Sequence, residues 1–567
     1  MQSYAPEVQN IKTFNNAVYY LDKNFINEAS WEDWENQAEN LQNSLTDDVI
    51  DNAFAKLLED TKGESIDNIK STLKQRRENI VSIAKDYYQY FKEHEIIVAT
   101  NKDNKVDVLR QPNGKTNVTI TQKDKTIFEN TYTKDITKEL WIYALDGDDE
   151  ISVTGDGNDY IQIKIFGGEE NDIYNIENNR SIKVYDYKSK ENTFNTPVSK
   201  KLTDSYDINN YDPQKRKYSN NVLLPTVGFD PDAGFSAGLT NTFTTYSLLR
   251  NPFTTQHTFN ASYYAATSGF EFSYDGEFAH IFHNWNLGID ARITSANYAI
   301  NFFGVGNETI YDEDDVDMDF NRVKIEQWHF QPSLIYKTDG NVSAHVAARV
   351  ESNKVDDTEN GFTQTFFSPD NDVFENQVYV GGEVGVNFNN KKGLISLPRR
   401  GMEFGLVAGY KQTIDSDFDN KFSYVTPTVS FIYPIHESGL ATLATKAQAN
   451  FILGDDYEFY HAATVGGNNS LRGFRNERFL GKTSFFQMTD LRVCFIEQRT
   501  GFVPLRIGVT GGFDLGRVWN ENEDSEKWHN SYGGSIFING FQAFTANIGY
   551  YQSVEDSRII FTAGFRF

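Results

Sequence analysis

The sequence predicts a mainly β protein: a sixteen-stranded antiparallel transmembrane β-barrel preceded by a helical segment and a small β-domain. Three observations lead to this prediction. Strand-like runs of about 9–15 residues recur from residue 221 to residue 567, and we count about sixteen of them, at the length that crosses a bilayer on a tilt. Aromatic residues make up 14% of the chain and cluster near the ends of these runs. Mean hydropathy is negative, which argues against a bundle of apolar helices.

Residues 1–94 are predicted to be helical. The clearest part is SIDNIKSTLKQRRENIVSIAKDYYQYFKE (65–93), in which apolar residues recur at helical spacing and form one face. Arg76 and Arg77 lie in the middle of this run, and we interpret them as part of a solvated face.

In residues 95–184, the apolar side chains recur at every second position instead of at helical spacing. Short strands such as IIVAT, TNVTITQ and YIQIKIFG are separated by Asn, Gly and Asp turns, so this segment is predicted to be a small β-domain. Residues 185–220 are polar and aperiodic, and they are predicted to be a linker.

Residues 221–567 alternate small or polar side chains on one parity with apolar or aromatic ones on the other, as in GLVAGYKQ (405–412). A large soluble β-sandwich or propeller is the alternative. The length of the runs favours the membrane barrel, because soluble strands typically have about 5–6 residues. Long acidic loops such as IYDEDDVDMDF also alternate with short turns such as YKTDGNVS, as in outer-membrane barrels.

The overall composition excludes some classes of protein. The formal net charge is −27, so most of the surface would repel nucleic-acid phosphates and no nucleic-acid partner is expected. Cys494 is the single cysteine, so no disulfide can form within the chain. The first residues, MQSYAPEVQN, lack the basic and apolar regions of a signal peptide. No uncharged apolar run approaches the ~18 residues of a membrane-spanning helix.

One short motif suggests catalysis but lacks the residues that catalysis would need. GDGND (155–159) fits the G-D-x-x-D element of two-metal phosphoesterases, yet the chain has no D-x-H before it and no G-N-H or G-x-H after it. We therefore expect no enzymatic activity in this chain.

The same stretch has a second interpretation as a calcium site. LDGDDEISVTGDGND and FGGEEND resemble the Gly-Asp turns of calcium-binding β-rolls. The candidate oxygen ligands are Asp146, Asp148, Asp156, Asp159 and Asp172. The spacing is irregular, and plain β-turns capped by Asp and Asn explain the run equally well, so both interpretations stay open.

Four motifs in the barrel region occur in an order that resembles one known superfamily. VGGNNSLRGF (465–474) resembles the loop-six signature of the BamA/TamA-like outer-membrane barrels, which has the pattern G-G-x-x-S-apolar-R-G-aromatic. GGFDLGRVWN (511–520) and SYGGSIFI (531–538) resemble later strands, and IIFTAGFRF (559–567) resembles the closing strand. The resemblance covers roughly residues 221–567.

The resemblance implies a sixteen-stranded barrel that is sealed where its first and last strands meet, at about 221–229 and 557–567. Loop six would fold back into the lumen, and its arginine would pair with an aspartate two strands further on. The residues implied for this attachment of loop six are Gly466, Gly467, Ser470, Arg472, Gly473, Phe474 and Asp514. Phe567 would be the C-terminal assembly signal.

Three stretches resemble a branch of this superfamily in which a calcineurin-like phosphoesterase precedes the barrel: LKQRRENIVSIAKDYYQYF (73–91), LWIYALDGDDEISVTG (140–155) and FFGVGNET (302–309). We then expect this chain to be a truncated precursor. The expected location is the outer membrane of a Gram-negative-type cell, with the N-terminal region in the periplasm. The expected role is insertion or translocation of polypeptides, with outer-membrane lipids, nascent or secreted polypeptides and assembly-machinery proteins as partners. The alternatives are an anchoring or secretion module for an attached metallophosphoesterase and a diffusion channel.

Overall fold

A computed structural model describes the chain except for a small number of residues. The residues outside the description are 1–3, 16–17, 59–62, 312–316, 339, 360, 395–396, 416–417, 437–438, 500–503, 522, 541–543 and 566–567. The chain divides into two compact units, Met1–Lys217 and Tyr218–Phe567, and each is described by itself.

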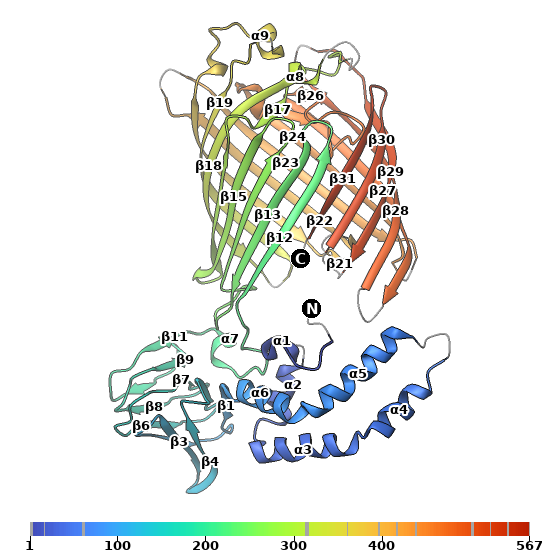
Figure 1. The fold of residues 1–567 in the computed structure, drawn as a ribbon. Coiled ribbons are helices and arrows are strands. Elements are labelled where there is room, and N and C mark those ends of the chain that lie inside the picture. Colours follow the sequence, from blue (N-terminus) through green and yellow to red (C-terminus); the bar gives the residue numbers. More distant parts are fainter. Residues whose placement is uncertain are drawn as a thin grey trace. The chain divides into compact units, whose positions relative to one another are not determined.

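Helices open the first unit (Figure 1). Their bounds are α1 Ile11–Phe14, α2 Tyr19–Phe25, α3 Trp31–Ser44, α4 Asp47–Ala55, α5 Glu64–Glu78 and α6 Ile80–Lys92. The run 65–93 therefore forms two helices that meet at Asn79. Aromatic side chains of α2, α3 and α6, such as Tyr19, Trp34 and Phe91, pack together and hold these helices to one another.

The rest of the first unit is built from two facing sheets. One has the order β1-β5-β7-β9-β11 and the other has the order β10-β8-β6-β2-β3-β4. From β5 onward, successive strands alternate between the two sheets and each pairs in parallel with the strand two positions later. The strands are β1 His94–Val98, β2 Lys105–Gln111, β3 Lys115–Gln122, β4 Lys125–Thr133, β5 Glu139–Tyr143, β6 Glu150–Thr154, β7 Gln162–Phe166, β8 Ile173–Ile176, β9 Ile182–Asp186, β10 Thr193–Phe194 and β11 Lys200–Leu202.

This arrangement is a β-roll, in which the chain winds so that each turn stacks on the previous one. Alternating Val, Ile and Leu side chains from both sheets fill its core, and Val106, Ile151 and Ile163 are fully buried there. The period of two in the sequence corresponds to one face of each strand pointing into this core.

The structure differs from the predicted linker at 185–220. This stretch contains β10, β11 and a short helix, α7 Tyr206–Asn209, and both strands extend the sheets of the β-roll. The two strands are two and three residues long, and each pairs with a strand of the preceding turn of the roll. Such short pieces carry no detectable period in the sequence.

The second unit is a closed antiparallel barrel, and its sixteen main strands follow one another around the wall (Figure 1). They are β12 Asn220–Asp230, β13 Gly234–Thr245, β14 Thr255–Tyr264, β15 Gly269–Phe282, β16 Trp285–Thr294, β18 Arg322–Lys337, β19 Val342–Val355, β20 Gln377–Asn389, β22 Leu397–Thr413, β23 Lys421–Pro434, β24 Ala441–Asp456, β27 Thr483–Arg499, β28 Pro504–Trp519, β29 His529–Gly540, β30 Phe544–Gln552 and β31 Ser557–Phe565. Two short strands, β17 Ala299–Asn301 and β21 Lys392–Leu394, pair antiparallel with the first residues of β18 and β22. The predicted fold class is confirmed.

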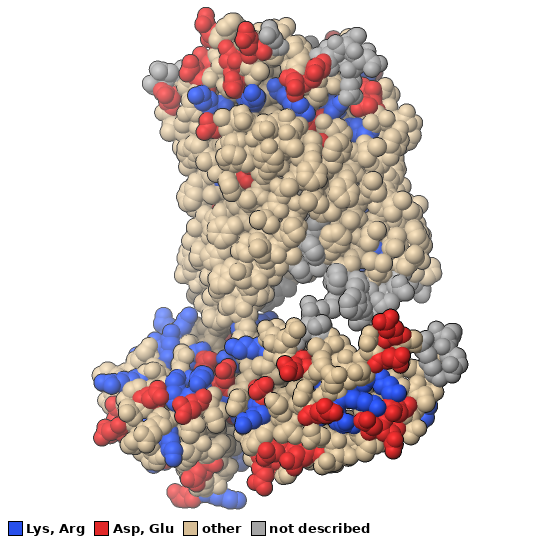
Figure 2. All heavy atoms as spheres, viewed as in Figure 1, with Lys and Arg blue, Asp and Glu red and all other residues tan. Residues whose placement is uncertain are grey.

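The outer wall of the barrel is apolar. On β12, the exposed side chains of Leu223, Val227 and Phe229 alternate with partly buried neighbours. Figure 2 shows that the visible wall carries almost no charged side chains, and that Lys, Arg, Asp and Glu gather at one end of the barrel. An apolar band of this kind is what a lipid environment requires of strands that cross it. Among the described residues, no helix is long and apolar enough to span a membrane.

The long connections all lie at one end of the barrel, which we call the loop end. They carry most of the small elements of this unit: α8 Met318–Asn321, α9 Phe362–Phe366, η2 Asp372–Phe374, η3 Phe459–His461, β25 Ala463–Val465 and β26 Phe479–Gly481. Figure 1 shows α8, α9 and β26 together at this end.

Candidate functional site

Loop six is the connection between β24 and β27, residues 457–482, and it is the sixth connection at the loop end counted from β12. Its two arms pair as the short antiparallel strands β25 and β26, and the predicted motif lies between them. The segment is buried although it is a loop: Leu471, Phe474 and Phe479 are each no more than 1% exposed.

The structure brings Arg472 and Asp514 together. The guanidinium of Arg472 donates from Nη2 to Asp514 Oδ1 at 2.6 Å and from Nε to Oδ2 at 3.0 Å. The backbone N–H of Arg472 donates to the same carboxylate at 3.0 Å, and the Ser531 hydroxyl donates at 3.0 Å. Asp514 lies on β28 and is fully buried. A bidentate, buried pair of this kind fixes both the position and the direction of the loop.

Further residues complete the surroundings of Arg472. Its Nη1 donates to the Tyr551 hydroxyl at 2.7 Å, and its guanidinium lies 4.3 Å from the centre of the Tyr551 ring. Asp490 forms a second ion pair with Nη1 at 2.9 Å. A Cβ at Gly512 would lie 2.6 Å from Nη2, so only glycine leaves room for the guanidinium there. We call Arg472, Asp490, Asp514, Ser531 and Tyr551 the latch.

The predicted glycines have two different roles. Gly466 and Gly467 have φ angles of 131° and 81°, a region that favours glycine. The Ser470 hydroxyl closes this turn, because it accepts from the Gly466 N–H at 2.8 Å and donates to the Gly466 carbonyl at 2.9 Å. Gly473 instead allows close packing: a Cβ there would lie 2.8 Å from the backbone carbonyl carbon of Gln552.

Phe474 anchors the apolar side of the loop. It packs with Leu471, Phe479 and the strand residues Phe486 and Val518 in one buried cluster. Its ring meets Phe479 edge-on at a centroid distance of 5.3 Å. Burying a phenylalanine side chain contributes about 1.5–3 kcal/mol relative to exposing it, so the loop has an apolar attachment beside the ionic one.

The seam between the first and last strands is short over the residues that the structure describes. β12 and β31 share three registered pairs, Val227 with Ala563, Gly228 with Thr562 and Phe229 with Phe561. On its other side, β12 pairs with β13 over 220–230, and β31 pairs with β30 over 557–565. The described parts of the two seam strands are therefore joined over a fraction of their length.

A second buried cluster ties loop six to both seam strands. Arg475 of loop six pairs with Asp232, just beyond β12, at 2.8 Å. Arg558 of β31 pairs with the same carboxylate at 2.9 Å and with Asp230 at 3.3 Å. The backbone N–H of Asn476 donates to Asp232 at 2.7 Å. We call these five residues the seam cluster, and through it loop six bridges the junction.

The five predicted calcium ligands do not converge on one site. Asp146, Asp148 and Asp172 lie in turns that follow β5 and β7, whereas Asp156 and Asp159 lie in the turn that follows β6, at the other edge of the roll. Among the described residues, no group of three or more His, Cys, Asp or Glu side chains is placed to hold a metal ion.

The acidic turns instead form ladders of hydrogen bonds from one turn of the roll to the next. In one ladder, the side chains of Asp103, Asp148 and Asn171 accept from the backbone N–H of Asp148, Asn171 and Glu191, at 3.2, 3.1 and 2.9 Å respectively. Each acceptor thus satisfies a backbone donor that the turn leaves without a partner within its own sheet.

The second ladder is buried. Asn104 N–H donates to Asp149 at 2.7 Å, Asp149 N–H donates to Asp172 at 3.0 Å, and Asp172 N–H donates to Asn192 at 2.8 Å. Burial raises the pKa of Asp149 to about 7. Burial and the nearby charge of Asp186 raise the pKa of Asp172 to about 8. The fold therefore favours the neutral form of these carboxyl groups near neutral pH.

Several residues of the site escaped the sequence analysis. Asp490, Tyr551 and the whole seam cluster carry no motif of their own, because their partners lie far away in the sequence. Ser531 and Gly512 do fall inside the motifs SYGGSIFI and GGFDLGRVWN, which is the signal that could have identified them. Phe567, the predicted assembly signal, lies outside the described residues.

No family model and no curated protein matches the chain. Among solved structures, it is similar to BamA from Haemophilus ducreyi lacking POTRA domains 1–3, with 16% identity and a TM-score of 0.46 over 62% of this chain and 71% of that one. It is also similar to CdiB from Acinetobacter baumannii (11% identity, TM-score 0.41, 62% and 60% covered) and to CdiB from Escherichia coli (12%, 0.42, 61% and 63%). The chain thus spans less than two thirds of either CdiB. No comparison supports the phosphoesterase branch. The chain is thus distantly similar in structure to these three proteins.

Proposed function

We propose that this protein acts in the insertion or translocation of polypeptides at the outer membrane of a Gram-negative-type cell. Its partners in this proposal are outer-membrane lipids, nascent or secreted polypeptides and assembly-machinery proteins, and its N-terminal unit lies in the periplasm. We assign no catalytic step to the chain.

The short seam is the single observation that carries the proposal. Backbone N–H and C=O groups that face lipid without a partner cost several kcal/mol each. A strand edge whose described residues pair at three registered positions is therefore a weak point in the wall. A polypeptide strand that pairs with such an edge would satisfy these groups. The seam is therefore the place where the wall is expected to open or to accept a substrate strand.

Loop six supports the same function because it is attached on both sides of the seam. The latch holds it to β28, β29 and β30, and the seam cluster holds it to β31 and to the end of β12. Loop six can thus keep the resting barrel closed while the seam itself contributes little. A diffusion channel would need neither attachment.

A reversible disulfide across the seam tests the proposal. Val227→Cys and Ala563→Cys place two cysteines at a registered pair of β12 and β31. Cys494 is replaced by alanine in every variant. The assay is insertion of a reporter β-barrel into vesicles that contain the full chain. We expect the oxidised variant to lose most of its activity and to regain it after reduction.

The matched control uses the same position on β12. Val227→Cys with Ala237→Cys joins β12 to β13, a pair of strands that stays together in any opening of the seam. Oxidation of this control should leave insertion unchanged. Full activity of the oxidised seam variant would refute the proposal.

A further inference from the structure

A cavity lies at the loop end of the barrel, apart from the latch. Its volume is about 730 Å³, within the range of cavities that take small molecules or a few side chains of a peptide. It is lined by the end of β24, by loop six and by three other connections at the loop end, residues 295–321, 356–376 and 520–528. Neither the latch nor the seam cluster contributes to its lining.

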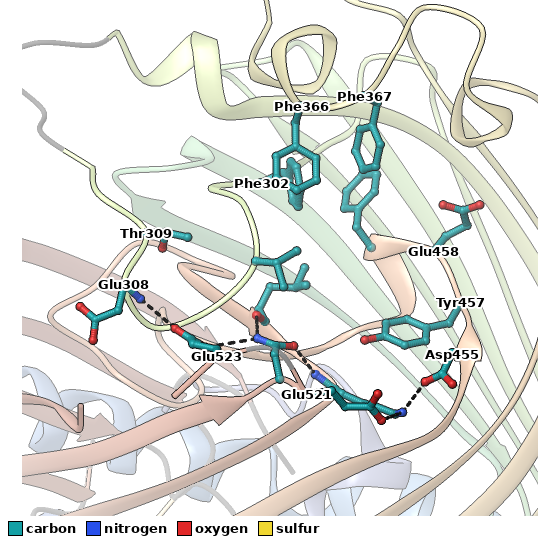
Figure 3. A pocket seen from close by; sticks show the side chains of 15 residues that line it. Phe302, Glu308, Thr309, Phe366, Phe367, Asp455, Tyr457, Glu458, Glu521 and Glu523 are labelled. Carbon is teal, nitrogen blue, oxygen red and sulfur yellow. Dashed lines mark hydrogen bonds and ion pairs between the residues drawn. The ribbon is translucent and has the colours of Figure 1, made fainter. Parts of the chain in front are cut away.

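One side of the cavity is aromatic. Phe302 lies at the centre of this wall, with ring centroids 5.1 Å from Phe366, 5.7 Å from Phe367 and 4.7 Å from Phe459. Phe302 and Phe459 are buried, whereas Phe366, on α9, is 47% exposed. Figure 3 shows the rings of Phe302, Phe366 and Phe367 together on one side of the cavity. An exposed ring backed by a fixed aromatic cluster presents an apolar face to a ligand at little conformational cost.

The other side is acidic. Figure 3 shows Glu308, Glu523, Glu521 and Asp455 along it, with Glu458 nearer the aromatic wall. Lys482 is the one cation among the lining residues that the structure describes.

Much of this negative charge has no counter-charge. Lys482 is shared between Asp455 and Glu521. Among the described residues, the one cation paired with Glu308 is Lys527, at 3.6 Å. Glu458 and Glu523 form no ion pair with any described residue.

The partners of these last two carboxylates are neutral donors. Glu523 accepts from the backbone N–H of Asn307 at 2.6 Å and of Glu308 at 3.2 Å, which holds it in place. Glu458 Oε1 accepts from the amides of Gln377 at 2.9 Å and Asn420 at 3.1 Å. Fixed carboxylates that lack a cation attract one from solution.

We propose that this cavity binds an organic cation joined to an apolar body. The ammonium or guanidinium group would lie among the carboxylates, and the apolar part would lie against Phe366 and the rings behind it. Aromatic faces add to the attraction of a cation that approaches them. An anion would be repelled, and a neutral ligand would leave the excess carboxylates uncompensated. The cation can be a free amine or a basic residue of a polypeptide, because both present the same chemistry.

Calorimetric titration of the full chain in a nonionic detergent tests this proposal. The probes are 4-phenylbutylammonium against its neutral analogue 4-phenylbutanol, and acetyl-Phe-Arg-Phe-amide against acetyl-Phe-Gln-Phe-amide. We expect each cationic probe to bind at least tenfold more tightly than its neutral partner, and the preference to shrink at high salt. The tighter of the two cationic probes then shows whether a free amine or a peptide is the better ligand.

Two variants assign the binding to the cavity. Glu458→Gln keeps a hydrogen-bond acceptor for Gln377 and Asn420, so it should weaken the cationic probes at least fivefold and leave the neutral ones unchanged. Phe366→Ala should weaken all four probes. Asp419→Asn removes an exposed loop carboxylate that does not line the cavity, and it should change nothing. Equal affinity for cationic and neutral probes, or wild-type affinity in both cavity variants, would overturn the proposal.

Discussion

Removal of either partner of the Arg472–Asp514 pair should destabilise the barrel, and removal of both should cost little more. In Arg472→Ala, the buried Asp514 loses the donors Nε and Nη2. Of its described donors, the backbone N–H of residue 472 and the Ser531 hydroxyl remain. Hydrogen bonds to charged groups contribute about 1.5–3 kcal/mol each, so we expect a loss of about 3–5 kcal/mol in the free energy of unfolding.

Asp514→Ala should cost less, about 2–4 kcal/mol, because Asp490 and Tyr551 still compensate part of the Arg472 charge. The double variant leaves no unpaired carboxylate at position 514 and should lose about 3–5 kcal/mol in total. The two residues are then coupled by about 2–4 kcal/mol, well above the about 0.3–0.5 kcal/mol expected for independent sites.

The measurement is urea-induced unfolding of the barrel in lipid vesicles, followed by tryptophan fluorescence. The control cycle combines Arg472→Ala with Glu271→Ala, which lies on β15 and pairs with Arg292 instead. The effects in this control should add. If the losses of Arg472→Ala and Asp514→Ala also add, the two side chains do not stabilise the barrel through each other.

Three further changes have defined outcomes. Gly473→Ala should lower the free energy of unfolding of the barrel by about 1–3 kcal/mol, because the added Cβ would overlap Gln552. A Cβ added at Gly511 would have no atom within 4 Å, so Gly511→Ala should not change the result of the same urea unfolding. Asp172 has a raised pKa of about 8 in the folded protein, against about 4 in the unfolded chain. The stability that this group adds is therefore full below about pH 4 and is lost as the pH rises through about 8. Amide-exchange protection of the β-roll should fall from about pH 6.5 to 8.5, and it should fall less steeply in Asp172→Asn. Asp232→Asn weakens the seam cluster by about 1–3 kcal/mol, so the amides of β12 should exchange about tenfold faster while those of β19 do not change.

The sequence was sufficient for the barrel because each of its strands repeats the same alternation over many residues. The sequence could single out the loop-six motif, since its glycines, Arg472 and Phe474 lie within ten consecutive residues and Asp514 lies in a motif of its own. The contact between Arg472 and Asp514 is present in the structure, and its role as a latch stays a prediction.

Long-range geometry explains what the sequence did not predict. Arg558 and Asp232 are separated by 326 positions and meet only because the barrel closes, so no local pattern marks them. The same explanation applies to the β-roll. The short strands β10 and β11 form by parallel pairing with strands of earlier turns, so their own sequence shows no strand pattern and predicts a linker. The acidic turns resemble calcium sites by composition, but the alternation between two sheets sends Asp156 and Asp159 to the opposite edge from Asp172.

The most direct test of the proposed function is photo-crosslinking between the seam strands and a polypeptide that is being translocated. A benzophenone amino acid at Val227 or Ala563 faces the junction of β12 and β31. The same probe at Phe259, an exposed residue of β14, reports on the wall away from the seam. We predict adducts with a polypeptide substrate from both seam positions and none from Phe259. Labelling of equal strength at all three positions, or no seam adduct while insertion proceeds, would contradict a role of the seam in handling the substrate.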